Sequence, residues 1–309
     1  GLYTTSCDIS VTLNAKESLF SLASGKISTG SGQGNIRLEA DDMDYKAGDN
    51  TIVGTGTSTL TILAHNEDQD YRIGGAGQEA FGNDYSNGTT GYMELGERDL
   101  SAFANGFNHI TIGHQRADGT GIMRIGDVKD GVLGQFNFSA KLNDVVTFIG
   151  DRMEIVGNIQ SSTAVYLDAR SLKVERQNIR TPMGIPDSGI TAKTIDITVD
   201  EQMLVMGWLI ADDRLDIRVT NTQTAGVFVS YGGEPNSFTA DKGSTIQTMK
   251  ANSSVSITTS ASIYSATGIF AGVDDGAANA SITVNAGTGL TLLEGVKIAT
   301  RNDTGSITL

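Results

Sequence analysis

A short strand pattern recurs along this chain of 309 residues, and its repetition limits the available folds more than any other feature. Near the C-terminus, three copies place Ile257, Ile282 and Ile307 at equal intervals along the sequence. Each copy is bounded by Gly, Asn or Asp, and shorter strand-like pieces lie between the copies. A repeat of this length cannot bury a core alone and must stack on its neighbours. The spacing therefore predicts a stacked, repetitive fold.

The middle of the chain carries the same pattern with a less regular period. Four alternating segments are centred on Glu154, Lys173, Asp196 and Asp216, and two apolar residues flank each centre. Such alternation predicts a strand with one side in the core and one side in solvent. The pairs predicted to be buried are Met153/Ile155, Leu172/Val174, Ile195/Ile197 and Leu215/Ile217.

These repeats predict an all-β fold, a parallel β-helix (β-solenoid) in which each turn, or rung, contributes three short strands. The 38 Gly, the 3 Pro and the 6% aromatic content also favour short strands joined by tight turns. A β-sandwich is the structural alternative, but it would need hairpin turns every 8–12 residues or so. We expect residues 1–309 to form one elongated solenoid, a segment of a longer rod.

The two ends of the chain resemble each other. Residues 25–38 and 296–309 align without a gap and share, for example, Ile36 with Ile307. A strand also begins close to the N-terminus, where Ile9 precedes Ile36 by about one repeat. Two hypotheses follow for the neighbours of the terminal rungs. They are either further rungs of a longer chain or identical subunits stacked end to end.

Residues 65–108 interrupt the repeat and are more polar than the rest, which predicts an insertion or an irregular rung. Asp99 is expected to cap a short helix that ends at Gly106, and a strand is expected over 109–114. The apolar face of this helix is expected to contain Leu100, Phe103 and Ala104.

Composition also limits the partners. The net charge of −14 and the pI of about 4.5 argue against nucleic acid and anionic membranes. No apolar stretch approaches the roughly 18 residues of a transmembrane segment. Cys7 is the single cysteine, so the chain can form neither an internal disulfide nor a zinc-binding cysteine cluster.

An enzymatic function is the main alternative to a structural one. Glu154, Lys173, Asp196 and Asp216 are predicted to form an outward ladder, and stacked acids of this kind can serve a polysaccharide lyase or hydrolase. The simpler interpretation is a polar surface that keeps a sheet soluble. We therefore predict no catalysis and assign no catalytic, cofactor-binding or metal-binding residue.

Histidines and acidic clusters give little further signal. His109 and His114 are predicted to lie in one strand and point to opposite faces, and His65 is isolated from both. The acidic clusters at 40–44, 66–70, 211–216 and 273–276 are interpreted as turn-forming aspartates, and weak surface calcium binding is left open. Trp208 and the eight tyrosines are scattered, which gives little support for an aromatic glycan-binding surface.

Two regions resemble the giant bacterial exoproteins of the filamentous-haemagglutinin type. Residues 54–75 and 91–128 contain a strand, a "DL-x-A-x-x-x-GF" segment, an "ITIG" strand and "DGTG", and 281–309 resembles the haemagglutinin repeats of the same family. These segments together cover under a third of the chain. The resemblance implies a right-handed parallel β-helix secreted by bacteria, at the cell surface or in a matrix. It also implies a structural or adhesive role, with glycans of host cells or of the cell surface as candidate partners.

Overall fold

The computed structural model describes residues 2–3, 11–14, 19–22, 24–30, 34–45, 47–66, 69–74, 92–115, 119–126, 139–175, 188–220, 238–240, 244–265, 267–274, 278–292, 295–300 and 304–309. In these residues the protein is almost entirely β, with one short helix. Every strand pair among them is parallel. The predicted all-β class with parallel strands is confirmed.

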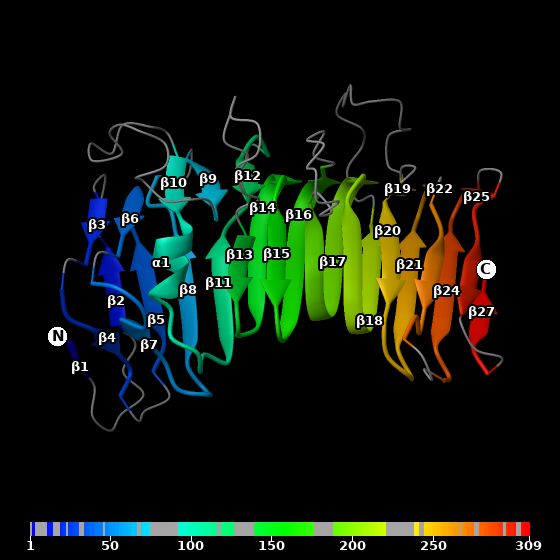
Figure 1. The fold of residues 1–309 in the computed structure, drawn as a ribbon. Helices are drawn as coiled ribbons and strands as arrows, with labels where there is room; N and C mark the ends of the chain where they lie inside the picture. The colour runs from blue at the N-terminus through cyan, green and yellow to red at the C-terminus, as the bar shows by residue number, and fades with distance from the viewer. Residues whose placement is uncertain are drawn as a thin grey trace, which may run out of the picture.

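The first ladder of strands runs along the whole length of the molecule (Figure 1). Its strands, in order of pairing, are β2 (Val11–Asn14), β5 (Ile36–Glu39), β8 (Thr59–Leu63), β11 (His109–Gly113), β14 (Val146–Ile155), β16 (Ala164–Val174), β17 (Gly189–Val205), β18 (Trp208–Val219), β21 (Ser254–Thr259), β24 (Ser281–Ala286) and β27 (Ser306–Thr308). One residue of each strand occupies the same register position, so aliphatic side chains from Ile36 to Ile282 form a buried column.

The second ladder is built partly from the C-terminal halves of the long strands. Its pairing order is β10 (Tyr92–Leu95), β9 (Asp70–Ile73), β12 (Ile122–Ile125), β14, β16, β17, β19 (Phe238–Ala240), β22 (Ser262–Ser265) and β25 (Gly289–Leu292). A two-stranded sheet of β3 (Leu19–Ser21) and β6 (Asp42–Asp44) precedes it, and β6 contacts β10.

The third ladder has two parts. One contains β1 (Leu2–Tyr3), β4 (Ile27–Ser28) and β7 (Ile52–Val53). The other contains β13 (Ser139–Leu142), β15 (Asn158–Ser161), β17, β18, β20 (Thr245–Thr248), β23 (Ile269–Ala271) and β26 (Ile298–Thr300). Helix α1 (Glu97–Ser101) lies between the two parts.

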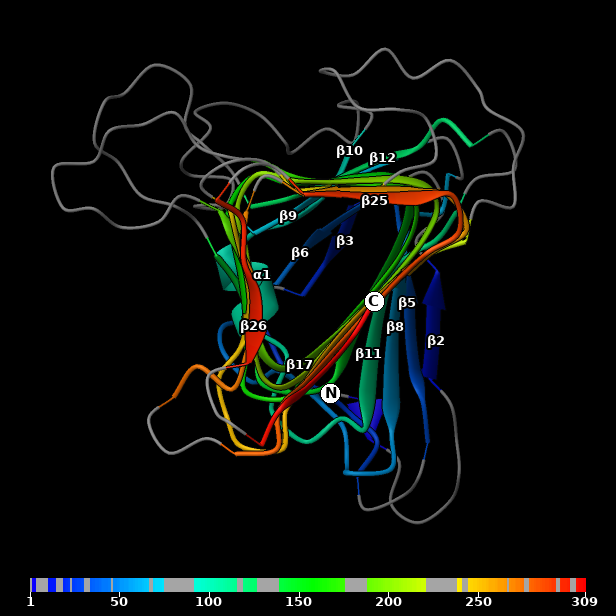
Figure 2. The same cartoon turned by 90° about the vertical axis from the view of Figure 1, so that its right-hand side faces the viewer.

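Seen along the long axis, the strands superpose in three walls around the core (Figure 2). The strand β17 contributes to all three ladders, because its chain bends at two corners. Pairing shifts register at these corners, between Ala169 and Ser171 and between Ala192 and Thr194. The apolar residues predicted to flank the four polar centres are all buried. Glu154 is buried as well, so the predicted alternation is confirmed around Lys173, Asp196 and Asp216 and is wrong at Glu154.

The equal spacing of Ile257, Ile282 and Ile307 does not correspond to one register position. Ile282 pairs with Val255 and with Ile307, whereas Ile257 pairs with Val284. The three isoleucines therefore do not share one column, and the repeat between β21 and β24 is longer than the interval between those isoleucines. β21 has three inward positions, Val255, Ile257 and Thr259, so the spacing of isoleucines does not show which residues pair. At the N-terminal end Val11 pairs with Ile36, and Ile9 lies outside the described residues.

Among the described residues of 65–108, the strands do not follow their sequence order in the ladder. The chain places β10 on the side of β9 that faces away from β12, although β10 follows β9 in the sequence. The second ladder therefore gains a strand here. Helix α1 then carries the chain to the third ladder, where Ala102 and Ala104 form backbone hydrogen bonds with Ile52.

The short helix differs from the prediction in its cap. Its N-cap is Gly96, and Asp99 occupies the third helical position. The buried carboxylate of Asp99 accepts hydrogen bonds from the backbone N–H of Gly96 at 2.9 Å and of Tyr45 at 3.0 Å. An acid in the first turn can satisfy the N-cap amide in this way. The helix ends at Ser101, before Gly106, and the predicted apolar residues Leu100, Phe103 and Ala104 are buried.

Candidate functional site

The four residues predicted to form one outward ladder lie in two different ladders. Glu154 pairs with Lys173 in the second ladder, and Asp196 pairs with Asp216 in the first. The prediction of a single line is wrong because each long strand turns a corner. Segments that look equivalent in sequence therefore lie on different walls.

Arginines hold both aspartates of the first ladder. The carboxylate of Asp196 accepts hydrogen bonds from Arg214 at 3.1 Å and from Arg218 at 3.2 Å, and Arg218 also binds Asp216. The arginine side chains are almost half exposed. Ion pairs at such positions contribute about 0–1 kcal/mol each. This network fixes the spacing of neighbouring carboxylates on a solvated sheet.

Glu154 is the most buried charge of the four predicted ladder residues. Its side chain is 5% exposed and binds Arg124 at 2.9 Å, with Arg152 as a second partner. Burial favours the neutral form, but the hydrogen bonds from Arg124 and Arg152 outweigh it and lower the pKa of Glu154. The carboxyl group holds no proton near neutral pH, so this geometry suits an ion pair and not a general acid.

The three histidines have separate partners. His65 Nδ1 lies 2.9 Å from Glu39 Oε1, and His109 Nε2 lies 2.7 Å from Thr147 Oγ1. His114 Nδ1 lies 2.9 Å from the hydroxyl oxygen of Tyr71. Burial lowers the pKa of His109, which favours its neutral form. Within the part of the chain that the structure describes, no three His, Cys, Asp or Glu side chains are grouped to hold a metal ion.

The acidic segment 40–44 contains the buried strand β6, where a turn was predicted, and Asp41 lies in the bend before this strand. Asp42 is 4% exposed and accepts hydrogen bonds from the backbone N–H of Met43 at 2.9 Å and of Glu94 at 3.4 Å. Burial, together with the nearby charges of Glu94 and Asp99, raises the pKa of Asp42 to about 7. The segment 211–216 also lies in a strand, β18. Cys7 and parts of the clusters at 66–70 and 273–276 lie outside the described residues.

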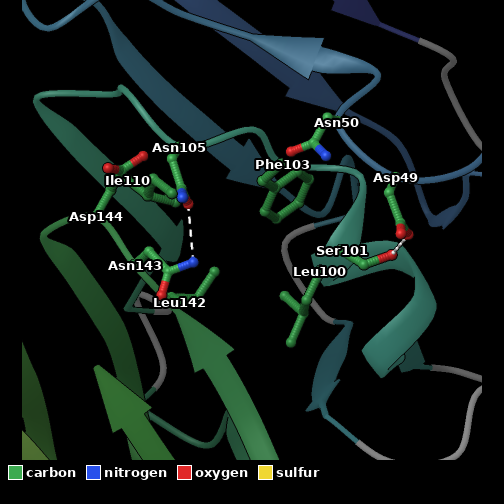
Figure 3. Close-up of a pocket in the computed structure, with 10 residues that line it drawn as sticks. All are labelled: Asp49, Asn50, Leu100, Ser101, Phe103, Asn105, Ile110, Leu142, Asn143 and Asp144. Carbon is green, nitrogen blue, oxygen red and sulfur yellow. Dashed lines mark hydrogen bonds between the residues drawn. The ribbon is translucent and has the colours of Figure 1, made fainter. Parts of the chain in front are cut away.

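A pocket of about 570 Å³ opens beside α1 and forms the candidate binding site (Figure 3). It lies where the third ladder is interrupted. Ala102 and Ala104 bind β7 on one side, while β13 pairs with β15 on the other. Among the described residues no strand pairing joins these two parts, because the helical segment cannot continue a ladder. The described residues that line the pocket are Asp49, Asn50, Leu100, Ser101, Phe103, Asn105, Ile110, Leu142, Asn143 and Asp144.

Two polar walls face each other across the pocket (Figure 3). On one wall the Ser101 hydroxyl donates to Asp49 at 2.5 Å. On the other, the Asn143 amide donates to Asn105 Oδ1 at 2.9 Å. This site was not predictable from sequence, because it depends on where the helix interrupts the ladder.

Asp144 fixes the second wall. Its carboxylate accepts hydrogen bonds from the backbone N–H of Gly106 at 3.0 Å and of Phe107 at 2.9 Å. The carboxylate thereby ties the turn after α1 to the end of β13. The described lining residues include two carboxylates and no lysine or arginine. The pocket consequently favours neutral or cationic ligands over anions.

Comparisons with known proteins identify no relative. No protein-family model matches the chain, no curated protein matches it, and no solved structure matches it. In the described residues, no helix has the length and apolar character needed to cross a membrane.

Proposed function

We propose that this chain is a structural segment of an extracellular bacterial fibre, surface adhesin or matrix layer, built as a right-handed parallel β-solenoid and without catalysis. Its role is mechanical: stacked rungs joined by backbone hydrogen bonds supply length and resistance to proteolysis. Right-handed winding is also what parallel strands joined by crossover connections adopt in about 98% of cases.

The observation that carries this proposal is the first ladder. Strands from β2 to β27 pair successively and in parallel, and the inward position stays aliphatic along the described chain. The inward side chains of successive strands pack into one buried core, so no single strand needs to bury a core alone. This repetition supports a rod whose stability comes from contacts between neighbouring rungs.

The family resemblance supports the proposed location. The segment that resembles the exoprotein unit corresponds to α1 and β11, and the haemagglutinin-like segment corresponds to β24 through β27. The acidic, cysteine-poor composition also suits a soluble surface outside the cell.

Two measurements test the proposal. Ten spacings of about 4.8 Å along the first ladder give a rod about 50 Å long, which small-angle scattering and electron microscopy can measure. A compact, isotropic particle would contradict the solenoid. Antibody labelling of intact producing cells, with protease treatment as the control, tests the extracellular location. Labelling only after lysis would contradict it.

The mass of the native polypeptide under denaturing conditions distinguishes the two expected kinds of neighbour. A mass well above 32.4 kDa indicates further rungs in the same chain. A mass near 32.4 kDa favours identical subunits stacked end to end, which sedimentation at increasing protein concentration can detect.

A further inference from the structure

The pocket beside α1 presents hydrogen-bonding groups that no other described residue uses. The side-chain amide of Asn50 makes no hydrogen bond to another described residue. The bond between Asn143 and Asn105 leaves the Asn143 carbonyl as an acceptor and the Asn105 amide N–H₂ as a donor. Both donors and acceptors are therefore present at the opening. A hydroxyl group both donates and accepts hydrogen bonds. It therefore matches this rim better than a ligand that carries acceptors alone.

The floor of the pocket is apolar. Phe103, Leu100 and Ile110 line it, and all three side chains are buried. Figure 3 shows the Phe103 ring between the two polar walls. Ligand pockets commonly combine an apolar surface with a few polar groups that fix orientation. Here the apolar floor suits the C–H face of a small ring, and the polar rim suits its hydroxyl groups.

Charge and coordination exclude two other ligand classes. Asp49 and Asp144 repel anions, and none of the described lining residues is basic. A bare Ca²⁺ ion needs six to eight oxygen ligands. The Asp144 carboxylate already accepts backbone N–H groups, and the floor offers no oxygen from its side chains. The volume of about 570 Å³ is also far larger than one water molecule, which occupies about 30 Å³.

We propose that this pocket binds a neutral, polyhydroxylated ring of the kind found in a hexose unit, either free or at the end of a glycan chain. Asn50, Asn105 and Asn143 contact its hydroxyl groups, and Phe103 packs against its C–H face. This site goes beyond the scaffold role and does not depend on it, because the pocket is formed within neighbouring rungs.

The test uses the 309-residue protein and defined probes. Glucose, galactose, N-acetylglucosamine and maltose are titrated at millimolar concentration, and binding is followed by saturation-transfer NMR and calorimetry. At least one of these sugars is expected to bind. Asn143→Ala is expected to weaken that binding about tenfold, since it removes one direct contact and the support of Asn105. The matched control Asn285→Ala changes an exposed asparagine on β24 and is expected to leave binding unchanged.

Circular dichroism checks that the variants remain folded. If Asn143→Ala does not fold, Asn105→Ala is used in its place. The proposal is overturned if none of the sugars binds, or if the sugars bind both rim variants as tightly as the original protein. Binding of calcium chloride or inorganic phosphate in place of the sugars also overturns it. A maltose response without a glucose response assigns the site to a glycan chain, and equal responses assign it to a single ring. Since rod length is measured separately, failure here leaves the scaffold proposal standing.

Discussion

At the scale of single residues, position relative to the sheet decides what a side chain does. Ile257 and Ser256 are neighbours on β21, yet Ile257 is fully buried and Ser256 faces outward. Asp216 and Asp42 are both strand aspartates. The first binds an arginine on the surface, and the second lies in the interior beside other acids. The chemistry of each residue follows from its side of the strand.

The stability of the protein is expected to depend on Asp42. Its folded-state pKa of about 7 lies above the value of 3.8 for a free aspartate, so the folded state holds a proton that the unfolded state has lost between these pH values. Stability should therefore fall as the pH rises from about 4 to about 7, by roughly 4 kcal/mol at most. Asp42→Asn, which cannot ionise, should flatten this fall.

Denaturant unfolding at several pH values measures the effect of Asp42. The surface substitution Asp274→Asn is the matched control and should keep the slope of the original protein. An identical pH dependence in Asp42→Asn and the original protein would show that Asp42 is ionised without cost in the folded state.

The core column makes a second residue-scale prediction. Ile257→Ala should lower the free energy of unfolding by about 2–5 kcal/mol, because it leaves a cavity between stacked strands. Ser256→Ala, one position earlier and facing outward, should change it by less than about 0.5 kcal/mol. Similar losses from both substitutions in thermal and denaturant unfolding would contradict the assigned register of β21.

At the scale of elements, strand ends and corners carry the special conformations. Gly113 ends β11 with φ of 91°, and a Cβ there would lie 2.3 Å from the carbonyl oxygen of Ile149 on β14. Gly289 begins β25, and a Cβ there would meet nothing within 4 Å. The two glycines therefore have different reasons for being present.

Substitution by alanine should separate these two positions. Gly113→Ala should destabilise the protein by more than about 1 kcal/mol, because it combines a positive φ with a close backbone contact. Gly289→Ala should be neutral or slightly stabilising, since alanine restricts the unfolded chain. Thermal unfolding measures both effects, and equal midpoints for the two variants would refute the assigned backbone at the end of β11.

At the scale of the whole molecule, each strand contacts mainly its neighbours in the same ladder. β21 pairs with β18 and β24, whereas β5 pairs with β2 and β8. In such a linear array, stability is close to a sum of local terms. A defect should therefore stay local and not spread evenly through the protein.

Hydrogen exchange can measure this locality. Ile257→Ala should speed amide exchange in β21 and in its partners β18 and β24, while exchange in β5 and β8 stays unchanged. Ser256→Ala again serves as the control and should alter neither region. A uniform increase in exchange along the chain would mean that the molecule unfolds as one cooperative unit.

The sequence by itself determined the local elements. Alternation around Glu154, Lys173, Asp196 and Asp216 predicted strands and buried flanks, because the two-residue period of a strand is visible in sequence. The apolar residues of α1 and the turn after it were also predictable from their spacing. These features depend on the nearest neighbours in the chain.

Only the tertiary structure decided which strands meet. It placed Glu154 and Asp196 in different ladders, paired Ile282 with Val255, and inserted β10 on the far side of β9. Corners and loops of variable length separate the strands, so spacing in sequence does not fix register. The pocket beside α1 arises in the same way, because it forms between segments that meet only after the chain has folded.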